Sequence, residues 1–188
     1  DREAVLAYAP AAARRASNLG ARREAAAQYE RALRFAGDLD PVERASLLEG
    51  LALEAYHTDQ MDRAIAARME AVAIWRAAGN HRKVGENLSQ LTRVLVMAGQ
   101  NAAGEQAISE AIAVLEPLPP SPELALAYQV YAHLRMLDRD TDAAVTWGEK
   151  AIELAERCHD ETTLIAAYNT IGSARIVAGD LSGTAALE

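Results

Sequence analysis

The sequence predicts an all-α protein, a right-handed α-solenoid built of stacked antiparallel helix pairs. Helix-breaking positions recur at spacings of 39, 40, 40 and 40 residues, and small and aliphatic residues follow the first four at fixed intervals. Between the breaks the apolar period is helical, with almost no alternating β-branched runs. A fixed period of roughly 20 to 50 residues is typical of stacked repeat proteins. The breaks are Gly20, Asp59, Gly99, Arg139 and Gly179.

The composition indicates a globular chain that can bury a substantial core. Its 188 residues are 51% hydrophobic, 24% charged and 5% aromatic, unlike a disordered chain. The formal net charge of −8 argues against a nucleic-acid-binding surface, which needs a basic face. No apolar run reaches the ~18 residues of a membrane span, no signal peptide opens the chain, and Cys158 is the only cysteine. We therefore expect a cytoplasmic protein without membrane contact or an intramolecular disulfide.

We expect two helices per repeat and one continuous solenoid over residues 1–188. The repeats are predicted at about 1–39, 40–80, 81–120, 121–159 and, incomplete, 160–188. Residues that cap, begin or end helices mark the joints between repeats. They are Asp40, Pro41 and Glu43, then Gly79 and Asn80, then Ser121, and finally Asp160.

Apolar stripes along the paired helices identify the expected core. In the second repeat, the first helix carries apolar residues at i, i+3, i+4 and i+7, the spacing of one helical face. The matching slots of the second and third repeats hold Leu48, Leu51, Ala52, Ala55, Ala64, Ala71, Val72 and Trp75, then Leu88, Leu91, Thr92, Leu95, Ile108, Ala111, Ile112 and Leu115.

The fifth repeat is expected to be cut short. Its first helix is predicted to run to about Val177, and only nine residues follow Gly179. A helix without its partner would leave its apolar stripe unburied, so we expect the sequence to be a piece of a longer chain.

The second-helix pattern of a small residue, an aromatic residue four positions later and Ala-Leu after that resembles the tetratricopeptide repeat (TPR). Ala25, Tyr29, Ala32 and Leu33 show this pattern. The chain departs from that family in its longer period, near 40 instead of about 34. The aromatic position is also replaced in the next three repeats, by Arg68, Ile108 and Gly148.

Nearly the whole chain is similar to the TPR-like region of large ATP-binding transcription regulators of the LuxR type (MalT-like). Passages such as "MDRAIAARMEAVAIWRAAGN" and "YNTIGSARIVAGD" carry this similarity. The resemblance implies a nucleotide-binding module upstream, which would bind ATP, and a helix-turn-helix module downstream. The segment itself lacks a phosphate-binding loop, because neither Lys83 nor Lys150 follows a glycine. We therefore expect it to bind no cofactor and no nucleic acid directly.

The inner groove, lined by the first helix of each repeat in TPR arrays, is the best candidate site. Its slots are polar and of mixed charge, which suits a protein or peptide partner or a small polar effector. Leu53, Met136 and Ile176 would add apolar contacts, and a plain solvated face is the alternative. The candidate residues are Arg14, Asn18, Glu49, Tyr56, His57, Glu86, Arg93, Gln129, His133 and Asn169.

We expect neither a metal site nor a catalytic site. The four histidines show no metal-binding spacing. Cys158, His159 and Asp160 are consecutive, and catalytic groups that converge in space are rarely adjacent in a turn. Six arginines of the first repeat, which include Arg22, Arg23, Arg31 and Arg34, form either a contact for a preceding domain or a solvated outer face.

These observations predict a non-catalytic sensor and interaction scaffold of a LuxR-type regulator. A ligand in the groove would shift the packing of the terminal repeats and so control DNA binding elsewhere in the full chain. The alternative is a free-standing interaction module or a homodimerisation scaffold unrelated to transcription, because exposed apolar solenoid ends need covering.

Overall fold

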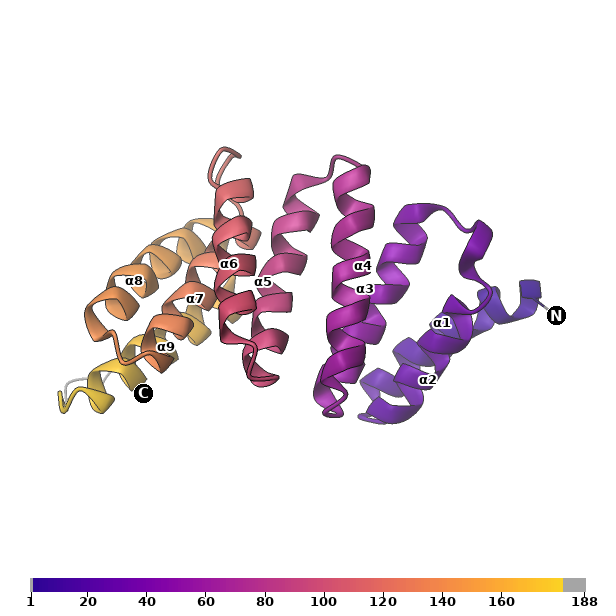
Figure 1. Ribbon diagram of the computed structural model, residues 1–188, viewed down its shortest axis with the longest axis horizontal. Helices are drawn as coiled ribbons and strands as arrows, with labels where there is room; N and C mark the ends of the chain where they lie inside the picture. The colour runs from indigo at the N-terminus through magenta and orange to yellow at the C-terminus, as the bar shows by residue number, and fades with distance from the viewer. Residues whose placement is uncertain (1, 181–188) are drawn as a thin grey trace. The chain divides into compact units, whose positions relative to one another are not determined.

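The computed structural model describes residues 2–180, in which helices joined by short turns form all of the regular secondary structure (Figure 1). These residues contain no strand, as the sequence predicts. The elements are α1 (Arg2–Asn18), α2 (Arg22–Leu33), the 3-10 helix η1 (Ala36–Asp38), α3 (Pro41–His57), α4 (Met61–Ala77), α5 (His81–Met97), α6 (Asn101–Leu115), α7 (Pro122–Leu137), α8 (Thr141–Cys158) and α9 (Glu161–Val177).

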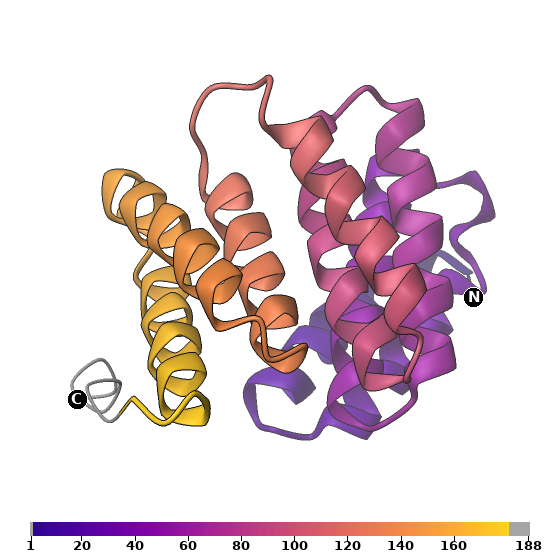
Figure 2. The ribbon, with the colours of Figure 1, turned by 60° about the vertical axis from the view of Figure 1, so that its left-hand side comes forward.

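The chain divides into two compact units, residues 1–104 and residues 105–188, with the boundary inside α6. In the first unit, α1 packs on α2, α2 on α3, α3 on α4 and α4 on α5. In the second unit, α7, α8 and α9 all contact one another (Figure 2). The continuity of one solenoid over both units stays a prediction, while the helix pairs within each unit are those that the sequence predicts.

Every recurrent break in the sequence lies at a left-handed residue that ends a helix. Gly20, Gly99 and Gly179 have φ of 75°, 73° and 85°, and the non-glycine breaks Asp59 and Arg139 have 61° and 62°. At each break, the amide of the following residue donates to the carbonyl five residues earlier, as in Gln100 N to Leu95 O at 2.8 Å. This is the Schellman motif, which satisfies carbonyls that the helix leaves unpaired. The period in the sequence is therefore a period of helix ends.

The residues predicted to cap helices lie at the N-termini of helices in the structure. The carboxylate of Asp40 accepts from Val42 N at 2.8 Å at the start of α3. Ser121 caps α7 and Asp160 caps α9 in the same way. Asn80, expected to end a helix, also caps the next one, because its side chain accepts from Lys83 N. The first helix of the fifth repeat ends at Val177, as predicted.

The predicted apolar stripes form the core of each unit. Of the predicted core residues of the second and third repeats, all are buried except Ile112, which is half-buried. Many are alanines, which let neighbouring helices approach closely. No helix in residues 2–180 is both long enough and apolar enough to cross a membrane. The shortened second helix expected after Gly179 falls at 181–188, outside the described residues.

Candidate functional site

The ten candidate residues divide between the two units of the chain. The first unit holds seven of them, on α1, α3 and α5, and the second holds three, on α7 and α9. The exposed members are Arg14, Asn18, His57, Arg93, His133 and Asn169; Glu49, Tyr56 and Glu86 are half-buried, and Gln129 is buried.

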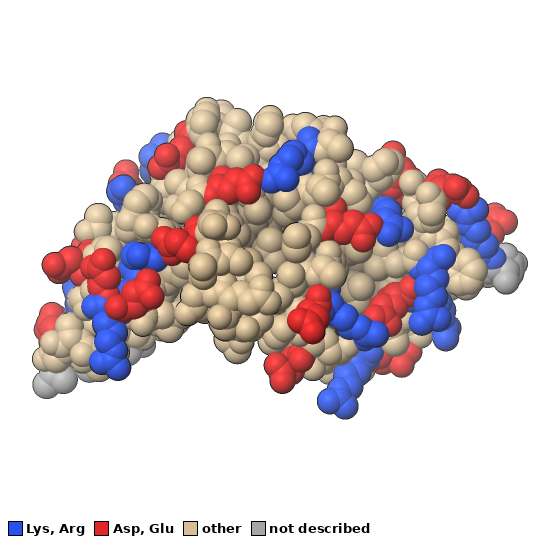
Figure 3. All heavy atoms as spheres, viewed as in Figure 1, with Lys and Arg blue, Asp and Glu red and all other residues tan. Residues whose placement is uncertain are grey.

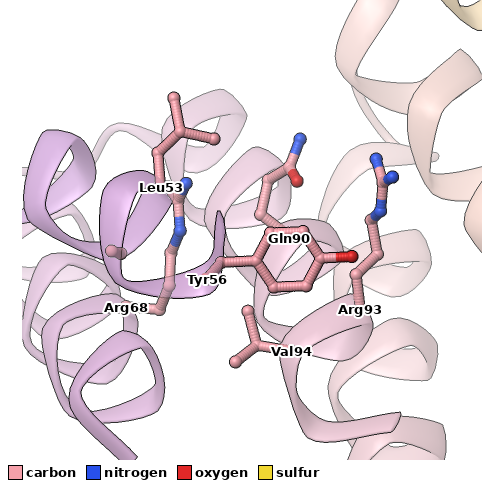
Figure 4. Close-up of a pocket in the computed structure, with 7 residues that line it drawn as sticks. Leu53, Tyr56, Arg68, Gln90, Arg93 and Val94 are labelled. Carbon is pink, nitrogen blue, oxygen red and sulfur yellow. The ribbon is translucent and has the colours of Figure 1, made fainter. Parts of the chain in front are cut away.

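Two of the candidates meet in a hollow between α3, α4 and α5. We call it the α3–α5 hollow; its lining is Ala52, Leu53, Tyr56, Arg68, Gln90, Arg93 and Val94, and it contains about 230 Å³ of space, part of it open to solvent. Figure 4 shows Tyr56 projecting from α3 toward Gln90 and Arg93 of α5. Leu53, predicted as an apolar flank of the groove, also lines it. Tyr56, Arg93 and Leu53 thus line the same hollow, while their role as a binding site stays a prediction.

The α3–α5 hollow is lined by positive charge without a carboxylate. Arg68 is 8% exposed, and its NH1 group donates to Oδ1 of Asn87 at 2.7 Å. Burial lowers the pKa of Arg68, and the negative charges of Glu49 and Glu86 oppose this shift. With Arg93, the hollow has two guanidinium groups, which are donors only. The arrangement can therefore bind a group that accepts hydrogen bonds.

Glu49 and Glu86, both groove candidates, are engaged within the protein. Glu49 Oε1 accepts from Trp75 Nε1 and from Asn87 Nδ2, each at 2.7 Å, and Glu49 Oε2 lies 3.3 Å from Lys83 Nζ. Glu86 Oε2 lies 2.8 Å from the same ammonium. Burial alone would lower the pKa of Lys83, but hydrogen bonds and attraction to the two carboxylates raise it overall. Lys83 thus pairs with both carboxylates, and Arg68, which both carboxylates also attract, supplies the second positive charge beside them.

Gln129 has a packing contact within the second unit. Its Nε2 donates to Thr170 Oγ1 at 3.2 Å, which connects α7 to α9, and its side chain is 7% exposed. A buried amide with this partner stabilises the helix pair. His133 and Asn169 lie on the same two helices with exposed side chains.

Arg68 and Gln90 line the hollow but were not predicted from the sequence to do so. Arg68 carried a signal, because it stands where the repeat pattern expects a buried aromatic residue. A charge at such a position requires a polar partner, which Asn87 provides. Gln90 carried no signal, since a polar residue on a first helix is common in this chain.

An aromatic cluster distinguishes the second unit. The ring of Trp147 on α8 lies 5.3 Å from that of Tyr128 and 4.9 Å from that of Tyr131, both on α7. Lys150 Nζ lies 4.0 Å from the Trp147 ring centroid, a cation–π contact. Tyr128 donates its hydroxyl proton to Glu116 Oε1 at 3.1 Å. The cluster holds α7 against α8.

We expect the stability of the second unit to fall between pH 10 and about pH 12. Burial, then the hydrogen bond to Glu116 and its charge, raise the pKa of Tyr128 from 10.0 to about 12. The unfolded chain therefore loses this proton first, so the stabilisation is complete below pH 10 and is lost as the pH rises through the folded pKa. Denaturant unfolding across this range should show the loss in wild type and a reduced loss in Tyr128→Phe. Equal pH dependence in both proteins would contradict the assignment.

The described residues contain no group of three or more His, Cys, Asp or Glu side chains that could hold a metal ion. His159 occupies a left-handed turn with φ of 55°, and the carboxylate of Asp160 caps α9. The consecutive Cys158, His159 and Asp160 therefore belong to a helix joint. On the face shown in Figure 3, acidic and basic side chains are interspersed and do not gather into one large area of either sign.

Comparison with known proteins establishes the fold. No protein-family model and no curated protein sequence matches the chain. Among solved structures, it is similar to a Podosopora anserina protein described as a kinesin light chain with nearly identical TPR-like repeats. That match has a TM-score of 0.75 and 17% identity, and covers 97% of this chain and 91% of the other. The chain therefore has the TPR-like repeat fold that the sequence predicts.

Two further matches are longer proteins. Aspartyl phosphate phosphatase F from Bacillus subtilis matches with a TM-score of 0.80 and 14% identity over 100% of this chain and 49% of its own. A Rap protein complexed with competence and sporulation factor matches with a TM-score of 0.79 and 15% identity over 97% of this chain and 55% of its own. The chain thus spans about half the length of these two proteins. At such identities the likeness concerns the fold alone.

Proposed function

We propose that this chain is a non-catalytic interaction scaffold that binds a protein or peptide partner through the α3–α5 hollow. The observation that carries the proposal is the lining of that hollow, in which Arg68, Arg93, Tyr56 and Gln90 can all donate hydrogen bonds and no carboxylate is present. The neighbouring carboxylates of Glu49 and Glu86 both pair with Lys83, and the charge of Arg68 balances the second of them, which leaves Arg93 for a partner. The hollow should receive a carbonyl or carboxylate group of the partner.

The size of the hollow favours a peptide over a small effector. Only about 10 Å³ of it is open to the centre of a water-sized molecule, whereas small-molecule sites usually enclose about 300–1,000 Å³. It therefore has room for about one water-sized group, such as a single carbonyl or carboxylate oxygen, and the rest of the partner must lie outside it. A peptide that extends along α3 and α5 satisfies this requirement. A Rap protein whose fold is similar to that of this chain has been solved in complex with competence and sporulation factor. That complex is compatible with such a role.

Peptide selection against the full chain tests the proposal. We expect the selected peptides to bind about tenfold or more weakly to Arg93→Ala and to Tyr56→Leu, since truncating a central contact residue removes most of its binding energy. Arg31→Ala and Tyr8→Leu, which alter exposed residues outside the hollow, are the matched controls and should bind normally. Calorimetry gives the affinities and circular dichroism checks the fold. Unchanged binding by the two hollow variants would refute the assignment.

The finer proposal is that the scaffold senses a signal within a LuxR-type transcription regulator. The sequence resemblance of the repeat region supports this proposal, which concerns modules outside the segment. The sequence of the complete gene tests it: a phosphate-binding loop upstream and a helix-turn-helix downstream are expected. If both are lacking, the free-standing interaction module becomes the better description, and light scattering then decides whether it forms a homodimer.

A further inference from the structure

The first unit has a second depression, which lies between α2, α3 and α4. We call it the α2–α4 groove; it contains about 910 Å³ of space, including open solvent, and shares no lining residue with the α3–α5 hollow. Its apolar lining is formed by Leu33, Leu48, Leu51, Ala66 and Ala67. Leu48, Leu51 and Ala67 are at most 8% exposed, so they form the floor of the groove and not its edges.

Charged residues line the edges of this groove, and one of them has no ion-pair partner within the part of the chain that the structure describes. Arg44 lies 2.6 Å from Glu70, and Arg63 lies 2.9 Å from Glu30. Arg34 also lines the groove, is exposed, and forms no ion pair within residues 2–180. The groove therefore carries three arginines against two glutamates, in a protein whose net charge is −8. The uncompensated charge favours an acidic group.

The fourth repeat shows what fills the same position of the fold. Two repeat periods after Leu48, Leu51 and Ala67 stand the aromatic residues Tyr128, Tyr131 and Trp147. The indole ring of Trp147 packs against both tyrosine rings. The helix face that carries the short side chain of Ala67 in the second repeat thus carries a large aromatic ring in the fourth. Because the side chain of Ala67 is short, the α2–α4 groove has space for such a ring beside it.

The charged residue beside the ring differs in sign between the second and the fourth repeat. Lys150 lies over the Trp147 ring, and its counterpart two periods earlier is Glu70. In the second repeat the cations come instead from Arg44 and Arg63, at the edges of the groove. Arginine stacks well on aromatic faces. The groove therefore offers both an apolar floor and cations to an incoming ring.

We propose that the α2–α4 groove binds a partner protein segment that carries a tryptophan, or another large aromatic residue, beside an acidic residue. The ring lies on Leu48, Leu51 and Ala67, as Trp147 lies on Tyr128 and Tyr131, and the partner's carboxylate pairs with Arg34. The inference goes beyond the proposed function, because it uses a different surface with a different chemistry.

Methyl NMR of the full chain with the peptide acetyl-Glu-Trp-Glu-amide tests this proposal. We expect shifts of the Leu48, Leu51 and Ala67 methyl groups that saturate at peptide concentrations up to about 10 mM, as for a dissociation constant near 1 mM. Acetyl-Glu-Leu-Glu-amide should bind about fivefold or more weakly, because leucine lacks the ring that arginine stacks on. Equal affinity for the two peptides, or no shifts of these methyl groups, would overturn the proposal.

Two variants and one control locate the site. Ala67→Trp fills the groove with the chain's own ring and should abolish binding, whereas Met69→Trp adds a ring at a residue that is 58% exposed outside the lining and should not. Arg34→Glu should weaken acetyl-Glu-Trp-Glu-amide about fivefold and leave acetyl-Gly-Trp-Gly-amide unchanged. This variant decides the question if Ala67→Trp does not fold. Unchanged affinity in folded Ala67→Trp or in Arg34→Glu, or shifts of the same methyl groups caused by protein concentration alone, would instead refute a partner segment of this kind.

Discussion

Arg22→Met should lower the free energy of unfolding of the first unit by about 3 kcal/mol. The reason is Glu54, whose side chain is buried between α1, α2 and α3 and is only 2% exposed. Its carboxylate accepts from Ser17 Oγ at 2.6 Å and from Arg22 NH1 at 3.2 and 3.3 Å. Without Arg22, a buried charge would keep a single hydroxyl donor.

The expected loss of unfolding free energy depends on which residue of the Arg22–Glu54 ion pair is removed. Exposed ion pairs contribute about 0–1 kcal/mol, and removing one partner of a buried pair costs about 3–5 kcal/mol. Arg22 is itself 38% exposed in its side chain, so water partly replaces it and the lower end of the second range applies. The cost arises at Glu54, whose side chain is 2% exposed in the intact protein.

Chemical denaturation with amide hydrogen exchange of α1, α2 and α3 measures this loss. The residue-resolved exchange is needed because the chain has two compact units that can unfold separately. Arg23→Met, at the neighbouring exposed position, is the control and should change the stability by less than about 0.5 kcal/mol. The double variant Arg22→Met/Glu54→Leu should recover part of the loss, because it removes both charges. If Arg22→Met and Arg23→Met are equally stable, the buried pair has no such role.

Most of the fold was predictable from the sequence, because helix ends have strict backbone requirements. Asp59 and Arg139 are neither glycine nor asparagine, yet their spacing from Gly20 and Gly99 identified them as breaks. The structure places both in the left-handed region. A repeated backbone geometry thus leaves a period that can be recognised even where the residue type changes.

The candidate site was predictable only in part, because register shows which face a residue is on and not what its polar atoms contact. Tyr56 and Arg93, two of the predicted groove residues, both line the hollow. Glu49 and Gln129 have comparable register positions, but their polar atoms are bonded to Asn87 and Thr170. Those contacts join residues about 40 positions apart in the sequence and depend on side-chain conformations across helices.

The close contact between α2 and α3 was also not predicted from the sequence. Gly50 lies in the middle of α3, where glycine is normally unfavourable by about 1 kcal/mol relative to alanine. The structure explains its presence. The ring of Tyr29 on α2 fills the space where a side chain at position 50 would begin, since a Cβ built there lies 2.4 Å from Cζ and 2.6 Å from Cε1 of Tyr29.

Gly50→Ala should therefore destabilise the first unit by about 2 kcal/mol, although alanine is the better helix former. Overpacking a core costs about 1–3 kcal/mol, and Tyr29 has little room to move: its ring is buried, with 8% exposure, and burial is the main reason that its pKa is raised. Gly37→Ala is the matched control, because a Cβ at position 37 meets no atom within 4 Å. Denaturant unfolding measures both variants, and Tyr29→Leu should cost less in the Gly50→Ala background than in wild type, since the smaller side chain relieves the overlap. Equal costs of Tyr29→Leu in the two backgrounds would show that the ring does not require glycine at position 50.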